Sequence, residues 1–182
     1  MEQLAPNATK IATKWALIYV LTAIVITYVV QFLNLDPNSP VKYLSYIPFI
    51  AFLLLAQKEY KDKLGGYIKF GEGFSTGFRY GVFAGILFGI FIYIYLAFLS
   101  PEMLAKSIDS QRDAMAAKGL SSEQVDKGIE MAKKYGAVFG AFGIAIWYAI
   151  LGVIVGLIGA AIFKKEHLPS DNDTTTYADP TV

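Results

Sequence analysis

Uncharged, mostly apolar residues occur along the chain in four long blocks that are separated by short charged segments. The blocks cover residues 15–35, 43–57, 80–101 and 135–163 and contain 21, 15, 22 and 29 residues. An α-helix needs roughly 20 apolar residues to cross a bilayer, so three blocks are long enough and the second is short. The pattern predicts an all-α membrane protein with four transmembrane helices, at about 15–35, 43–57, 74–99 and 136–163.

The second block contains Pro48. Lys42 and Lys58 at its ends can extend their ammonium groups toward water and so lengthen the usable span. Proline is tolerated in lipid where neighbouring groups bond the carbonyl that it frees. We therefore expect a second helix with a kink, and a re-entrant segment is the alternative.

The segment 101–134, between the third and fourth blocks, contains six basic and six acidic residues. Ser100-Pro101-Glu102 is typical of a helix start and Gly119 of a helix end, and residues 121–124 form a capping box that opens a second helix toward Tyr135. We expect a two-helix insert at the outer membrane surface. Its mixed charges are typical of a solvated face, and a docking surface for a partner is the alternative.

The lysines indicate the orientation in the membrane. Those near short segments would all lie on one side: Lys10, Lys14, Lys58, Lys61, Lys63, Lys69, Lys164 and Lys165. Basic residues beside short loops mark the cytoplasmic side, so both termini are predicted to be cytoplasmic, although Lys133 and Lys134 argue weakly against this. Residues 1–14 are a short cytoplasmic lead, and residues 166–182 are a polar cytoplasmic tail expected to be disordered.

Glycines recur every four residues at the start of the third span. They are Gly73, Gly77, Gly81, Gly85 and Gly89, and the fourth span has Gly152 and Gly156 in a similar phase. Small residues at this spacing allow two helices to approach closely in lipid. We expect these helix-packing glycines to bring the third span against the fourth within one chain; a seam between two chains is the alternative.

Polar residues near the spans give two further candidates. Glu72 and Arg79 lie seven residues apart on one face of the third helix; they are a candidate polar gate, while interfacial anchoring is the simpler interpretation. Thr22, Thr27 and Gln31, with Ser45 on the second span, are candidates for lining a solute cavity. Hydrogen bonds between helices are the simpler interpretation for these four.

Composition argues against most chemistry. The chain has no cysteine, a single histidine (His167) and a net charge of +1, so we expect no catalytic residues, no cofactor, no metal site and no nucleic-acid partner. None of the four predicted spans carries an ionisable residue at membrane depth, which argues against a proton or cation carrier. We expect a protein that is not an enzyme.

The third-span segment GYIKFGEGFSTGFRYGVFAG and the insert SPEMLAKSIDSQRDAMAAKGLSSEQVDKGIEMAKKY resemble the bacterial domain-of-unknown-function family 4199. The similarity covers roughly residues 10–165. The resemblance implies a multi-pass protein of the bacterial inner membrane and brings no activity, ligand or catalytic residue.

These observations favour a non-catalytic structural or accessory membrane subunit, held by glycine-lined helix packing as a homo-oligomer or in a larger membrane complex. The alternative is a small-solute or lipid transport component that acts as an oligomer. The lipid bilayer is the one partner that follows directly from the apolar blocks.

Overall fold

The computed structural model describes residues 6–35 and 40–166. All secondary-structure elements named within these residues are helices. The elements are α1 (Ala8–Phe32), the 3₁₀-helix η1 (Pro40–Tyr43), α2 (Tyr46–Lys63), α3 (Phe70–Ile94), the π-helix η2 (Tyr95–Leu99), α4 (Pro101–Ala117) and α5 (Ser122–Phe163). The predicted disordered tail from residue 167 onward, the first five residues of the lead and residues 36–39 lie outside the described residues.

Three helices of the described chain are long and apolar enough to cross a membrane: α1, α3 continued by η2, and α5. They coincide with three of the predicted spans. The chain is therefore a helical membrane protein.

The second predicted span differs from the helix in the structure. α2 begins at Tyr46, three residues later than expected, and continues through the charged residues to Lys63. Its uncharged part, 12 residues from Tyr46 to Gln57, is about 18 Å long. Pro48 lies in the first turn, where its missing N–H has no helical acceptor, so the predicted kink is wrong and the proline is compatible with a regular helix start.

The fourth span and the helix before it form one continuous helix. α5 runs for 42 residues from a capping box in which Ser121 and Gln124 bond each other's backbone N–H groups. The sequence predicted a separate helix ending near Tyr135, but good helix formers such as Ala132 and Lys133 continue the helix across that boundary. α4 begins at Pro101 and ends before Gly119, which has a φ of +74°.

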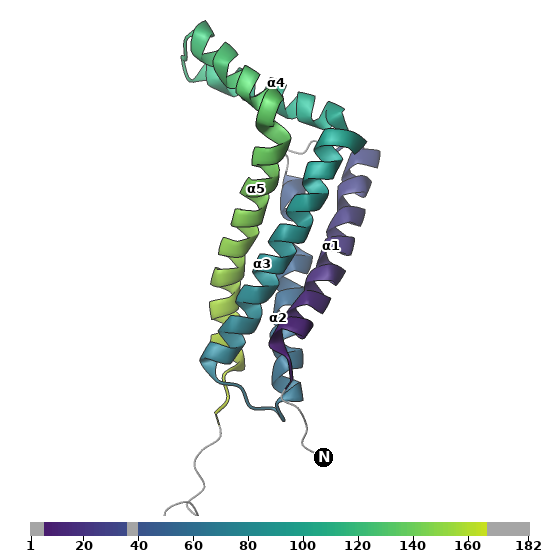
Figure 1. Cartoon of the computed structure of the whole chain (residues 1–182), viewed down its shortest axis with the longest axis vertical. Helices are drawn as coiled ribbons and strands as arrows, with labels where there is room; N and C mark the ends of the chain where they lie inside the picture. Colours follow the sequence, from purple (N-terminus) through teal and green to yellow (C-terminus); the bar gives the residue numbers. More distant parts are fainter. Residues whose placement is uncertain (1–5, 36–39, 167–182) are drawn as a thin grey trace, which may run out of the picture.

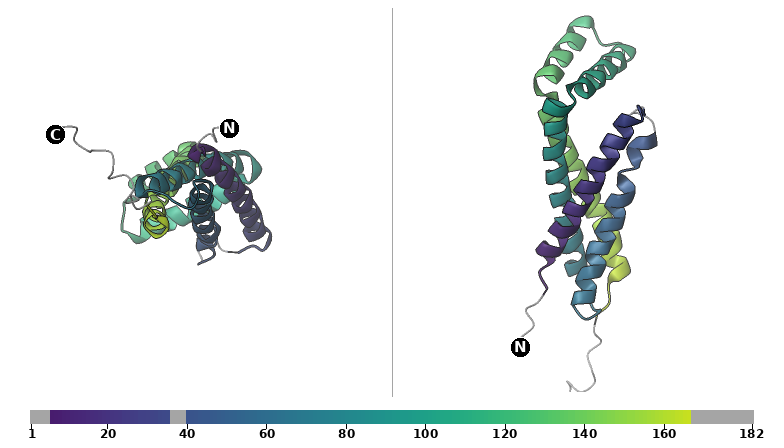
Figure 2. Two further views of the ribbon diagram at one scale, coloured as in Figure 1. Left: turned by 90° about the horizontal axis from the view of Figure 1, so that it is seen from below. Right: turned by 90° about the vertical axis from the view of Figure 1, so that its right-hand side faces the viewer.

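α3 lies at the centre of the bundle, where it contacts α1, α2 and α5. Figure 1 shows both described chain ends at one end of the bundle, and α4 crossing its other end. Figure 2 shows α4 and the start of α5 projecting from the bundle as a hairpin. Ile108, Val125 and Ile129 form the small buried core of this hairpin.

The buried core of the bundle lies nearer the end that carries the termini. Aromatic rings from four helices meet there: Tyr19 with Phe49 at 5.3 Å, Phe49 with Tyr80 at 5.2 Å and Phe49 with Tyr148 at 4.9 Å between ring centroids. The Tyr80 hydroxyl donates to the Phe49 carbonyl at 3.1 Å. In α1 the last buried residue is Ala23, so the remaining two turns of this helix pack less closely.

Candidate functional site

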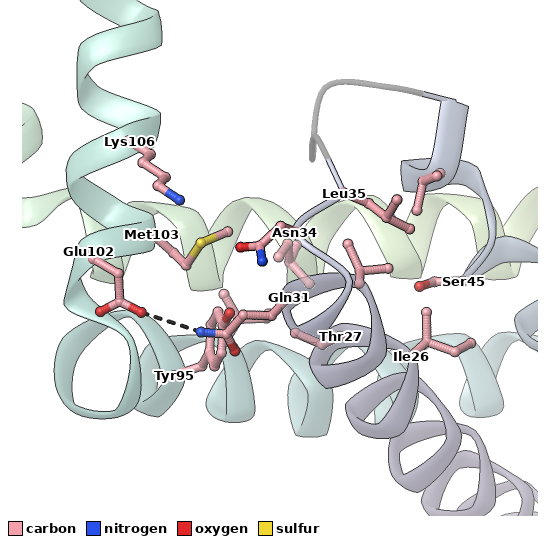
Figure 3. A pocket seen from close by; sticks show the side chains of 14 residues that line it. Ile26, Thr27, Gln31, Asn34, Leu35, Ser45, Tyr95, Glu102, Met103 and Lys106 are labelled. Atoms are coloured by element: carbon pink, nitrogen blue, oxygen red, sulfur yellow. Dashed lines mark hydrogen bonds between the residues drawn. The ribbon is translucent and has the colours of Figure 1, made fainter.

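A pocket of about 790 Å³ occupies the loosely packed end of the bundle. It lies between the end of α1, the segment from η1 to the start of α2, the end of α3 with η2, the first turns of α4, and one residue of α5. The lining residues are Ile26, Thr27, Val30, Gln31, Asn34, Leu35, Val41, Ser45, Ile92, Tyr95, Glu102, Met103, Lys106 and Ile144. Figure 3 shows their side chains directed toward one common space.

The pocket is polar on one side and apolar on the other. We call Gln31, Asn34, Glu102 and Lys106 its polar rim, and Ile26, Val30, Ile92 and Ile144 its apolar interior. The rim comes from the last turn of α1, from Asn34 two residues beyond it, and from the first two turns of α4, whereas the interior comes from the apolar parts of α1, α3 and α5. A volume of this size is within the range of small-molecule sites.

The rim is held together by the amide of Gln31. Its Nε2 donates to Ser100 Oγ at 2.9 Å and to Glu102 Oε1 at 3.3 Å. η2 makes this possible, because the Ser100 backbone N–H bonds the Tyr95 carbonyl five residues back, and α4 then starts in a new direction at Pro101. π-helical turns of this kind are frequent at functional sites.

Of the four residues predicted to line a solute cavity, the structure brings three to this pocket. Thr27, Gln31 and Ser45 line it, while Thr22 does not. The hydroxyl of Thr22 donates to the Ile18 carbonyl, and that of Thr27 donates to the Ala23 carbonyl. Asn34, Glu102 and Lys106 were not among the predicted candidates. Glu102 and Lys106 lie near Gln31 because of the direction in which α4 leaves η2.

In the described part of the chain, no ion pair joins Glu72 to Arg79, the two residues of the candidate polar gate. Glu72 accepts from the Lys69 backbone N–H at 2.9 Å and so caps the start of α3. Arg79 donates to Thr9 Oγ1 on α1 at 2.8 Å. Seven residues correspond to two turns of helix and about 10 Å of rise, so the carboxylate of Glu72 and the guanidinium of Arg79 reach different neighbours. Each acts as a local anchor at the end that carries the termini.

The glycines of α3 lie against small residues of α5 in the same chain. The neighbours are Ala160 for Gly73, Gly156 for Gly77, Gly152 for Gly81, Ala145 for Gly85 and Ala141 for Gly89. The approach is closest in the middle, where a Cβ built on Gly81 would lie 2.6 Å from the Gly152 Cα. We call this series the glycine contact.

Gln57 is a buried residue for which the sequence analysis gave no role. It is fully buried, and its Nε2 donates to the carbonyls of Gly73 and Gly156, both at 2.9 Å. Its Oε1 has no hydrogen-bond partner among the described residues and lies where a side chain at Gly159 would be. One amide of α2 therefore joins α3 to α5 beside the glycine contact, and only glycines leave room for it.

A cluster of charges joins α1 to α2 at the same end. Glu59 accepts from Lys14, from Trp15 Nε1 at 2.7 Å, and from Lys63 at 2.8 Å. Burial acts to raise the pKa of the Glu59 carboxyl, but the hydrogen bonds from these three donors outweigh it and lower the pKa to about 2. Glu59 is therefore ionised at neutral pH.

The model of one protein family, described as "Protein of unknown function (DUF4199)", matches residues 14–165. The chain belongs to the DUF4199 family. The match includes every residue of the pocket and of the glycine contact, so both are part of the DUF4199 domain. Comparison of the chain with curated proteins and with solved structures finds no match to either.

Proposed function

We propose that this DUF4199 protein is a non-catalytic, four-span protein of the bacterial inner membrane that binds a membrane lipid in the pocket, as a component of lipid transport. The observation that supports this most strongly is the arrangement of the pocket lining. Its polar rim lies where α1 and η2 end, and its apolar interior continues along the helices that are long and apolar enough to cross a membrane. An amphiphile with a headgroup and an acyl chain matches that order of surfaces.

The fourth span would be α2 preceded by η1. α2 contacts α1, α3 and α5, so it shares the depth of three helices that can cross a membrane. In this proposal Lys58, Lys61 and Lys63 reach the cytoplasmic surface, together with both termini. The projecting hairpin of α4 and the first part of α5 is then the two-helix insert, on the outer side.

The glycine contact supports a structural role within the chain. Because α5 already covers the glycines of α3, we propose that they stabilise the protomer, and this argues against a seam between two copies on that face. The sequence analysis favoured a structural or accessory subunit held by glycine-lined packing. We now favour its alternative, a component of lipid transport.

A pocket-filling variant tests the proposal. Ile92→Trp should place a large side chain in the apolar interior, whereas Ile94→Trp places the same side chain on an exposed position of α3. The protein would be purified in mild detergent from its own membrane, and co-purified lipid would be counted by native mass spectrometry. We expect bound lipid on the wild type and on Ile94→Trp and little on Ile92→Trp. Equal lipid on all three proteins, at equal thermal stability, would contradict the proposal.

An accessory subunit of a larger membrane complex is the second candidate function. The projecting hairpin favours it, because its outer surface carries exposed charged residues of both signs, which is suited to a protein partner. The mass of the particle extracted from the native membrane tests it. A second protein in fixed stoichiometry would support this candidate, and a particle of this chain and lipid alone would count against it.

A further inference from the structure

The polar rim carries one carboxylate and one amine on neighbouring turns of α4. Glu102 and Lys106 stand four residues apart, a spacing at which glutamate and lysine ordinarily pair on a helix surface. Of the three other glutamate–lysine pairs of the described chain at this spacing, Glu59 with Lys63 and Glu123 with Lys127 are closed, at 2.8 Å and 2.6 Å, whereas Glu130 and Lys134 form no ion pair with each other. Among the described residues, Glu102 and Lys106 form no such ion pair with each other or with a third residue.

Both groups are instead turned to the pocket. Oε1 of Glu102 accepts from Gln31 Nε2, which fixes the carboxylate at the rim, and Figure 3 shows the Lys106 amine directed into the space between α4 and Asn34. The rim therefore offers a cationic donor and an anionic acceptor to the same ligand. Their side chains start about 5–6 Å apart, as is usual one turn apart on a helix.

This arrangement selects among headgroups. An anionic headgroup without an amine would bring its phosphate to Lys106 and leave Glu102 facing it without a cation. A choline headgroup carries a positive charge but no N–H to donate to a carboxylate. A headgroup with both a phosphate and a primary ammonium, joined by a short linker, can satisfy both side chains through charge-assisted hydrogen bonds.

We propose that the pocket binds a phospholipid with a phosphoethanolamine headgroup, its phosphate on Lys106 and its ammonium on Glu102. The acyl chains lie along the apolar interior, over Ile26 and Ile92. This inference rests on the proposed function, because it names the lipid class that the pocket takes.

The test is lipid competition on the purified full-length protein. Phosphatidylethanolamine, phosphatidylcholine and phosphatidylglycerol with identical acyl chains would be offered in equal amounts, and bound lipid would be read by native mass spectrometry. We expect phosphatidylethanolamine to exceed each competitor by about tenfold, the factor that corresponds to one charge-assisted hydrogen bond.

Two rim variants separate the roles of the charges. Glu102→Gln should bring the phosphatidylethanolamine to phosphatidylcholine ratio close to one while phosphatidylcholine binding is retained, because it removes the anion that recognises the ammonium. Lys106→Gln should weaken the binding of all three lipids, since each has a phosphate. Asp109→Asn and Lys118→Gln, which change exposed charges of the same hairpin outside the pocket, are the matched controls and should change neither ratio nor amount.

The outcomes distinguish this inference from the proposed function. Lipid that is displaced by Ile92→Trp but shows no headgroup preference would overturn the phosphoethanolamine assignment and leave the lipid site standing. No lipid sensitive to Ile92→Trp would overturn both. The last experiment uses soluble O-phosphoethanolamine as a competitor of phosphatidylethanolamine. We expect it to compete poorly, because it lacks the acyl chains. Competition equal to that of the lipid would show a site for the free headgroup and contradict the lipid assignment.

Discussion

Along the glycine contact, which runs from Gly73 at the end of the bundle that carries the chain termini to Gly89, α3 and α5 approach so closely that a Cβ on Gly81 would lie 2.6 Å from the Gly152 Cα. At the other end α1 has no buried residue after Ala23, and a pocket of about 790 Å³ is lined by its last turns, η2 and α4. The first region uses small residues and one buried amide, whereas the second uses larger aliphatic side chains and charged groups. We infer that the two regions have different roles. The glycine contact holds the helices together, and the pocket leaves space for a ligand.

The largest effect is expected from enlarging the glycine contact. Gly81→Ala places a Cβ against backbone of α5, which cannot move aside as a flexible side chain can, and should lower the free energy of unfolding by about 1–3 kcal/mol; Gly81→Leu should prevent accumulation of the folded protein. Gly143→Ala is the matched control, because a Cβ there has no neighbour within 4 Å. Thermal unfolding in detergent measures both. Equal stabilities of Gly81→Ala and Gly143→Ala would show that the contact does not hold the bundle.

Gln57→Glu should be the next most damaging variant at neutral pH, after Gly81→Leu. It replaces the amide nitrogen that faces the carbonyls of Gly73 and Gly156 with a carboxylate oxygen, at a cost of more than about 1–3 kcal/mol for a buried charged group left unsatisfied. Protonation restores one donor, so this variant should gain stability relative to the wild type as the pH falls. Gln57→Leu should lose less, because it also removes the unpartnered Oε1. If Gln57→Leu were less stable than Gln57→Glu at pH 7, this would contradict the role of Gln57 in joining α3 to α5.

The charged cluster around Glu59 should give a smaller effect on stability than Gln57→Glu, and its dependence on pH should have the opposite sign. Its carboxyl pKa is lowered from 4.5 to about 2 in the folded protein, so its stabilising contribution is complete above pH 4.5 and is lost as the pH falls toward 2. The melting temperature of the wild type should therefore decrease across this window, and that of Glu59→Gln should decrease less. Parallel pH profiles of the two proteins would show that the cluster contributes nothing to stability.

The smallest effect on folding is expected in the pocket. Gln31→Leu removes hydrogen bonds to Ser100 and Glu102 at a partly exposed site, so we expect a loss within about 1 kcal/mol. Lipid retention should fall much more than stability, because the rim loses the group that positions Glu102. Thr22→Val, which changes a hydroxyl of α1 outside the pocket, is the control. A melting temperature lowered as far as by Gly81→Ala would mean that the open end also holds the bundle.

Three of the four predicted spans, those of α1, of α3 with η2 and of α5, were accessible from the sequence because long uncharged blocks carry that information directly. The limits of α2 and the continuity of α5 were not, since both depend on helix continuing through charged residues such as Lys58 and Lys133, where hydropathy changes but helix propensity does not. Pro48 was misread as a kink because its place in the first turn depends on where the helix begins.

The candidate site was only partly predictable for a similar reason. Gln31 and Ser45 could be recognised as polar residues within apolar blocks, but Glu102 and Lys106 looked like two of many charges on a solvated insert. Gln57 bonds carbonyls 16 and 99 residues away, so no local pattern could reveal its partners. Glu72 and Arg79 share a helical face, but the structure shows that each bonds to the nearest group beside it.

Photochemical cross-linking of lipid to the protein tests most directly whether the pocket is the part of the bundle that binds a ligand. A phosphatidylethanolamine with a photoreactive group in its acyl chain would be reconstituted with the full-length protein, and the cross-linked residues would be mapped by peptide mass spectrometry. We expect adducts concentrated on the pocket lining, at residues such as Ile26, Ile92 and Met103, and their loss in Ile92→Trp. Adducts spread evenly over exposed positions such as Leu21, Ile90 and Ile158, with none in the pocket, would contradict the account.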